Sequence, residues 1–259
     1  MNKYLALLAA ITIGLAAPPA RAQFEAAGVS PMDETMSKVF GTNLNFSADM
    51  ETQIKMMPKQ ENMAMNGRIF FAGGNSRTEI DMTSMQGRQM TPQAAAQMKA
   101  MGMDKMIAIS HTDTKAMYMI YPGLQAYAKI EMPDPKKTAT NDFKVQTIKL
   151  GEETVDGYPC DKNQYTVNNS RTGMRLIMTT WNATDLKNIP IKIAQSAWAS
   201  TDSYDGTSTT MHFTHINPTQ PDASLFEPPA GFKKYDNIQT MMQAEVMKKM
   251  GGQSQPAGR

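Results

Sequence analysis

Cysteine is almost absent from this sequence. Cys160 is the only one, so the chain cannot form an internal disulfide and its fold must rest on packing alone. A lone thiol in such a chain is most simply a small buried side chain, and we expect it at the start of a strand. Pairing with another molecule, or a reactive thiol, is the alternative.

Net charge is also lacking. The sequence has 26 basic and 24 acidic residues, and two of the basic ones, Lys3 and Arg21, lie in an N-terminal stretch with the features of a leader. The remainder is neutral, so it has no basic surface to attract nucleic acid or an anionic membrane. The composition therefore predicts no nucleic-acid partner.

Long apolar runs are missing after Ala22, so we expect no transmembrane segment, which would need about 20 apolar residues. Before that point, a short positive start is followed by an apolar stretch from Tyr4 to Ala17. Ala20-Arg21-Ala22 then has the small-x-small pattern of a signal peptidase site. The sequence predicts a bacterial signal peptide over residues 1–22, cleaved after Ala22, and a soluble protein in the periplasm or secreted.

Familiar catalytic motifs are absent too: the sequence has no G-x-S-x-G, P-loop, H-E-x-x-H or Rossmann fingerprint. His212 and His215 lie three apart on a predicted strand, so they should point to opposite faces unless a bulge intervenes. We interpret His215 as inward-facing, and His111 and His212 as surface residues. The sequence predicts no catalytic residue, no cofactor and no enzymatic activity.

Methionine is what the chain has in excess, with 25 residues against 9 phenylalanines and 2 tryptophans. Its flexible, polarizable side chain packs against ligands of varied shape, which favours core or cavity lining. Its thioether is also a soft ligand suited to Cu(I). A copper site at Met98, Met101 and Met103 is therefore the alternative.

Period-two alternation is the clearest structural pattern. From Leu44 to Met56, apolar residues share one parity and polar residues the other, which is typical of a half-buried strand. Met63, Met65, Ile69 and Phe71 continue the pattern, so they should face the same interior as Leu44, Phe46, Met50 and Ile54. Further strands are expected at 76–82, 105–110, 116–121, 124–132, 143–150, 151–155, 160–167, 173–181, 189–197 and 207–216.

Two helices interrupt this rhythm. Thr91 and Pro92 form a helix start, Gln93 to Met101 is rich in Ala, and Gly102 is the stop. The second helix should begin at Asp236, with Gln239 completing a capping box. It has an apolar stripe of Ile238, Met241, Met242, Val246 and Met250.

These elements predict a mainly β (α+β) fold of about ten or eleven antiparallel strands. A single sheet of that size must curl, so we expect a curved half-barrel with covering helices and a cavity between them. The domain should span residues 23–235, followed by a C-terminal amphipathic helix and flexible tail at 236–259. Polar residues 133–141 are expected to form a loop rather than a domain boundary.

Four segments resemble the periplasmic lipoprotein-carrier superfamily with the LolA/LolB-like fold, and more closely an uncharacterised exported bacterial branch of it. They are 67–80, with Gly67-Arg68-Ile69-Phe70 and Arg77-Thr78-Glu79-Ile80; Met117 to Pro122 before Tyr127; Leu150 to Cys160; and Trp181 to Ile191, closed by Leu225 to Phe232. The resemblance implies an eleven-stranded half-barrel around an apolar cavity, and no catalytic residues.

The sequence thus favours a soluble periplasmic binding or carrier protein for a lipophilic ligand: an acyl chain, a lipid or a lipidated peptide. A lipoprotein or envelope protein would be a further partner. A copper-buffering protein, or an envelope assembly factor with no small ligand, are the alternatives. The helix from Pro92 to Met101 should act as a movable lid. The expected cavity residues are Phe46, Met50, Met63, Met65, Met98, Met101, Met119 and Met178.

Overall fold

A computed structural model describes residues 44–56, 61–86, 90–131, 143–169, 175–198 and 206–252. The predicted signal peptide at 1–22, the loop at 133–141 and the tail at 253–259 lie outside the described residues. No helix among the described residues is long and apolar enough to cross a membrane.

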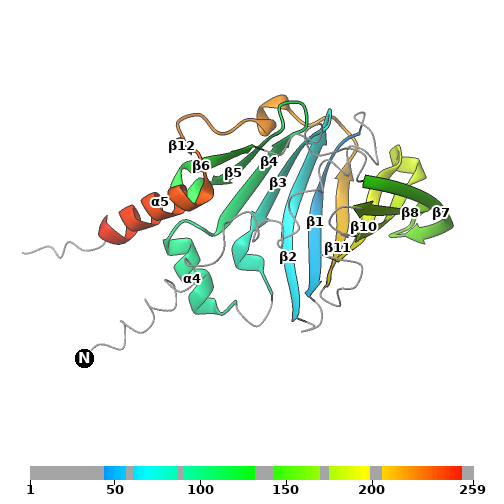
Figure 1. The fold of residues 1–259 in the computed structure, drawn as a ribbon, viewed down its shortest axis with the longest axis horizontal. Coiled ribbons are helices and arrows are strands. Elements are labelled where there is room, and N and C mark those ends of the chain that lie inside the picture. The colour runs from blue at the N-terminus through cyan, green and yellow to red at the C-terminus, as the bar shows by residue number, and fades with distance from the viewer. Residues whose placement is uncertain are drawn as a thin grey trace, which may run out of the picture.

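Mostly β structure is confirmed, as one curved, open 12-stranded sheet in the described part of the chain (Figure 1). Its order is β12-β6-β5-β4-β3-β2-β1-β11-β10-β9-β8-β7. The strands are β1 (Asn45–Met56), β2 (Glu61–Ala72), β3 (Asn75–Asp81), β4 (Lys105–His111), β5 (Ala116–Tyr121), β6 (Ala126–Glu131), β7 (Phe143–Val155), β8 (Tyr158–Asn169), β9 (Arg175–Ala183), β10 (Ile189–Trp198), β11 (Gly206–Asn217) and β12 (Lys233–Tyr235).

Two meanders meet in the middle of this sheet. Strands β1 to β6 form one, β7 to β11 form the other, and β1 pairs antiparallel with β11 to join them. The last strand, β12, returns to the far edge and pairs parallel with β6. The second half of the chain therefore pairs with the first half at two places, β11 with β1 and β12 with β6.

The connection between β6 and β7 requires the sheet to be curved. These strands are ten positions apart in the sheet order, which would separate them by about 48 Å in a flat sheet. The 12 steps from Glu131 to Phe143 span at most about 43 Å. The sheet therefore cannot be flat, and in Figure 1 the strands on the right, β7 and β8, run in a different direction from the central strands β1 and β2.

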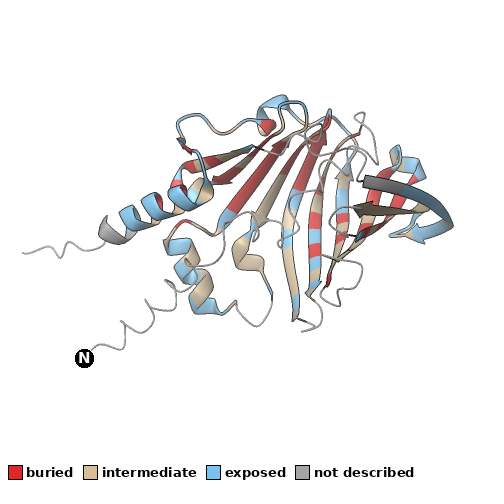
Figure 2. Cartoon of the chain, in the orientation of Figure 1, coloured by how far each residue is buried: buried red, intermediate tan, exposed pale blue. Residues whose placement is uncertain are grey.

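Alternation along β1 divides the sheet into two faces (Figure 2). Phe46, Ala48, Met50 and Thr52 are buried on one face, here called the apolar face. Through the register, Met63, Met65, Ile69 and Phe71 of β2 share it. The predicted common interior is confirmed, with the outer residues Ile54, Met63 and Met65 only half-buried.

The apolar face holds the largest core. Phe46 packs against Phe71 and Phe213, with ring centroids 6.2 Å apart in both pairs. Toward β6, Met106, Met117 and Met119 extend the buried surface. The full central cluster is Leu44, Phe46, Ala48, Met50, Ile69, Phe71, Met178, Ile189, Ile193, Met211 and Phe213.

The opposite face has two smaller cores, each covered by a different segment. Phe226, in the short helix η6 (Ala223–Phe226), packs with Phe70, Ile107 and Ile109. At the other end, Cys160, Trp181, Ala183 and Ile191 cluster beneath the β7–β8 turn. The predicted burial of Cys160 at the start of its strand is confirmed.

Both expected helices are present, but their placement differs from a cover over the sheet. Helix α4 (Pro92–Ala100) has no buried residue and contacts η2 (Met82–Ser84), beyond the ends of the strands in Figure 1. Helix α5 (Ile238–Gly252) packs on β6 and β12 through Met241. Helix α5 alone therefore covers one edge of the sheet, and only part of the predicted covering is observed.

Several predicted boundaries are corrected. The N-cap of α5 is Asn237, whose Oδ1 accepts from Thr240 N at 2.8 Å, so Asp236 does not cap the helix. The predicted strands at 143–150 and 151–155 are one strand, β7, with a register irregularity between Lys149 and Gly151. Strand β12 was not predicted, because three residues are too few to show a period-two pattern.

Candidate functional site

Half of the predicted cavity residues belong to the core. Phe46, Met50 and Met178 are buried in the central cluster of the apolar face. Met119 is fully buried in the neighbouring cluster with Met106 and Met117. Their packing against other side chains explains why they are apolar, and no further role is needed for them.

Met63 and Met65 lie on the same face but are only half-buried. The register places Met63 opposite Ile54, Met65 opposite Thr52 and Glu61 opposite Met56. On the next strand, Ile80 is opposite Gly67. We call the resulting contiguous set the methionine strip: Ile54, Met56, Met63, Met65 and Ile80, all half-buried.

Close backbone packing keeps the strip next to the core. Gly67 lies between the strip and the central cluster, and the Cε of Met50 lies 3.4 Å from the place where a Cβ on Gly67 would be. That Cβ would collide with the carbonyl oxygen of Glu79 in β3. Glycine here lets β2 and β3 approach while the Met50 side chain covers the backbone.

Helix α4 holds Met98 and Met101 at its C-terminal end, where both are half-buried. Thr91 caps the start through its Oγ1, which accepts from Ala94 N at 3.1 Å, as predicted. Gly102 ends it with φ of +73°, and its backbone packs directly against Gly123. This contact fixes the end of α4 against the β5–β6 connection.

The alternative copper ligands Met98, Met101 and Met103 all lie at this end of α4. Met103 packs with Tyr121 and Met242 in the cluster under α5, which accounts for its apolar side chain. Within the described residues, no group of three or more His, Cys, Asp or Glu side chains could hold a metal ion.

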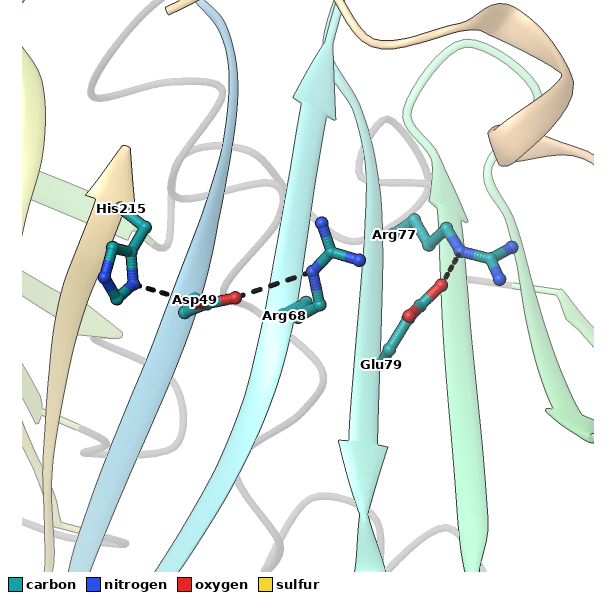
Figure 3. Close-up of polar contacts among 5 residues, drawn as sticks. All are labelled: Asp49, Arg68, Arg77, Glu79 and His215. Carbon is teal, nitrogen blue, oxygen red and sulfur yellow. Dashed lines mark hydrogen bonds and ion pairs between the residues drawn. The ribbon is translucent and has the colours of Figure 1, made fainter. Parts of the chain in front are cut away.

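Charged side chains cross the opposite face of the central strands (Figure 3). Asp49 in β1 contacts Nδ1 of His215 at 2.9 Å and Nε of Arg68 at 3.5 Å. Arg77 pairs with Glu79 at 2.7 Å and donates to the carbonyl oxygen of Leu225 at 2.9 Å. Arg77 therefore ties the segment around η6 to β3.

The histidine predictions were partly wrong. His215 is not inward: its side chain is 84% exposed, because an irregularity between β1 and β11, where His215 has φ of +50°, turns it toward Asp49. His111 is not on the surface, since its Nε2 donates to the carbonyl oxygen of Phe226 at 2.6 Å. His212 is partly exposed and pairs with Asp156.

Trp181 of β9 contacts charged side chains from three neighbouring strands, β7, β8 and β10. Its Nε1 donates to Glu153 at 2.9 Å, and Nζ of Lys162 and of Lys192 each lie 4.8 Å from its ring centroid. Hydrogen bonds from Lys162 and then from Trp181 lower the pKa of Glu153. The Trp181 ring is buried, so we assign these contacts to stabilising the packing of β7 to β10 and not to ligand binding.

Glu245 in α5 is a buried acid that the sequence analysis missed. The hydroxyl of Tyr235 donates to its Oε1 at 2.6 Å, and Nζ of Lys233 lies 3.5 Å away. These contacts, the Tyr235 hydrogen bond first, hold the pKa of Glu245 below its usual value. The only signal in the sequence is an acid beside the apolar stripe of the helix.

Solved structures that resemble this chain are distant from it. A domain described as an outer membrane lipoprotein-sorting protein from Vibrio parahaemolyticus matches at TM-score 0.33 and 14% identity, over 76% of this chain and 95% of that one. A DUF1329 family protein from Desulfovibrio piger matches at 0.31 and 12%, over 75% and 94%. The lipoprotein LppX of Mycobacterium tuberculosis matches at 0.32 and 9%, over 73% and 96%.

No curated protein matches the sequence. The predicted placement in an uncharacterised group is confirmed by a family model. That model, described as a domain of unknown function (DUF4412), matches residues 50–189, more than half of the sequence, and the chain therefore belongs to the DUF4412 family.

Proposed function

We propose that this protein binds and carries a lipophilic molecule, with the methionine strip as the place of contact. The observation behind the proposal concerns burial along the apolar face. Side chains around Phe46 are fully packed by their neighbours, whereas those of the methionine strip are only half-buried. Two of the five side chains are isoleucine and three are methionine, so the surface is apolar throughout. Methionine can repack around chains of different shape.

Location and partners belong to the same proposal. The predicted signal peptide would deliver the protein to the periplasm, where acyl chains, lipids and lipidated peptides need a carrier between membranes. A lipoprotein or another envelope protein would supply or receive the ligand. Helix α4 would then act at the rim of the strip, since it contacts η2 directly after β3.

Two measurements test the proposal. Native mass spectrometry of the protein purified from its own periplasm should show a bound lipid mass. A fluorescent apolar probe should bind the purified protein and be displaced by lipid, and Met63→Gln with Met65→Gln should weaken binding at least tenfold.

The matched control is Asn62→Gln with Asn66→Gln, which changes exposed residues of the same strand on the opposite face. It should leave binding unchanged. No lipid mass and no probe binding by the folded protein would refute the carrier function. Equal weakening by both double variants would remove the strip as the site.

A further inference from the structure

Resting on the proposed function, we propose that the ligand is electrically neutral where it contacts the apolar face: an uncharged acyl ester lipid rather than an ionised fatty acid. The basis is the distribution of charge between the two faces of the described strands. It deepens the carrier proposal by excluding one large class of lipophilic molecules.

Charged side chains are absent from the apolar face over a wide area of the described sheet. The register gives the apolar-face positions of β1, β3 to β6 and β9 to β11, and of β2 from Met63 on, and none is Asp, Glu, Lys or Arg. On the opposite face, β1 to β3 carry Asp49, Glu51, Lys55, Arg68, Arg77, Glu79 and Asp81.

The charges that do share the apolar face lie at its margins. Lys149 of β7 is 2.8 Å from Asp161 of β8 and 3.9 Å from Glu152, which lies opposite Asp161, so acids outnumber bases at this margin. Lys233 of β12 pairs with Glu245 at the far edge.

The polar groups that the register places beside Ile54 and Met65 of the methionine strip are neutral. Thr52 lies between Met50 and Ile54 in β1, Thr209 is opposite Ile54, and Gln195 is opposite Thr209. A hydroxyl or amide can donate a hydrogen bond to an ester carbonyl, but it cannot balance a carboxylate. An ionised headgroup placed here would be desolvated without a counter-charge, which is strongly unfavourable.

The test compares two probes that differ only in charge: a pyrene-labelled fatty acid and its methyl ester, at about pH 8, where the acid is ionised. We expect the ester to bind at least tenfold more tightly than the acid. A variant that adds a positive charge to the strip, Met65→Lys, should reverse the preference by binding the acid more tightly than the ester.

Asn66→Lys is the matched control, because it adds the same charge at the next residue on the opposite face and should keep the preference for the ester. If Met65→Lys does not fold, as judged by circular dichroism, Thr209→Lys tests the same point from β11. Equal or tighter binding of the acid by the native protein would overturn the inference while leaving the carrier function standing. Binding of neither probe would refute the carrier function itself.

Discussion

At the scale of single residues, Trp181 connects β9 with three other strands of the sheet. Its indole donates to Glu153 of β7 and lies between Lys162 of β8 and Lys192 of β10. The ring is buried with Cys160 and Ile191. One side chain therefore links four neighbouring strands through both packing and charge.

Trp181→Ala should lower the free energy of unfolding by about 3–5 kcal/mol, because it removes a large buried aromatic and one of the two hydrogen bonds that Glu153 accepts, the other being from Lys162. Phe226→Ala should cost a similar amount, since Phe226 of η6 is buried against Phe70 and Ile109. Urea denaturation followed by circular dichroism measures both. Tyr158→Ala, at a 40% exposed aromatic, is the control and should cost less than about 1 kcal/mol. Equal effects at all three positions would contradict this assignment.

Gly67 is required for a different reason, the approach of two backbones. Gly67→Ala places a Cβ against the Glu79 carbonyl in a well-packed part of the sheet, so we expect a loss of about 1–3 kcal/mol in the free energy of unfolding. Gly73→Asn serves as the control, because Gly73 has open space around it and φ of +59°, which asparagine tolerates. The urea midpoint of unfolding is measured for both variants. An unchanged midpoint for Gly67→Ala would show that β3 can move away from the added Cβ.

His215 shows why some residues could not be placed from the sequence. Its parity along β11 predicts an inward side chain, but the irregularity opposite Asp49 adds a residue and reverses the facing of the residues after it. His111 was misplaced for another reason. Its partner, the Phe226 carbonyl, comes from a segment more than one hundred residues away, which no local pattern reveals.

At the scale of elements, α5 is held by an apolar contact and a polar one. Met241 is fully buried against Leu124, Ala126 and Ala128, as its place in the predicted stripe implies. Four residues later, on the same side of the helix, Glu245 is buried against Tyr235. The helix is thus attached to β12, a strand too short to stay in place by its own pairing.

The polar contact should make α5 docking depend on pH. The pKa of Glu245 lies below its usual value of 4.5, so the Tyr235 contact stabilises the fold above that pH and is lost as pH falls through the lowered pKa. At about pH 6, Tyr235→Phe should cost about 1.5–3 kcal/mol, the range for a hydrogen bond to a charged group. That cost should be smaller at a second, acidic pH below the lowered pKa of Glu245.

Urea denaturation of the native protein and Tyr235→Phe at both pH values measures this difference. In a Glu245→Gln background the same tyrosine change should show no such pH dependence, because the titrating group is gone. A cost that stays constant between the two pH values would show that the pair contributes through packing alone.

Elements with a long, regular pattern were predictable, and elements defined by distant contacts were not. β1 has twelve residues of strict alternation, so its state and its facing followed from the sequence. The cap and stop of α4 were also correct, because Thr91 and Gly102 act locally. Where α4 lies was not predictable, since none of its residues is buried and its position rests on η2 and Gly123.

At the scale of the whole molecule, the sequence predicted a curved antiparallel sheet but not the order of its strands. The pairing of β1 with β11 unites residues far apart in the chain, and it decides which methionines share a face. Met63 and Met65 lie half-buried in the methionine strip. Met119 and Met178 went into the core instead, because their strands lie where other side chains cover the apolar face.

The same topology predicts how the protein should behave when its chain is cut. β1 and β11 are paired along nearly their whole length, and β12 and α5 contact β6. The second half of the chain therefore contacts the first half both at the middle of the sheet and at its edge. A protease site inserted between Lys136 and Lys137, outside the described residues, lets the connection between β6 and β7 be opened after folding.

After cleavage, the two pieces should elute together in gel filtration and unfold in one cooperative urea transition, because neither half can bury its face of the sheet alone. Gln53→Pro in β1 is the companion variant, since proline in a central strand removes a hydrogen bond of the ladder shared with β11 or β2. We expect the cleaved variant to separate at a lower urea concentration than the cleaved native protein. Separation of the native pieces in buffer alone would show that the β1–β11 pairing does not hold the two halves together, and that the connection does.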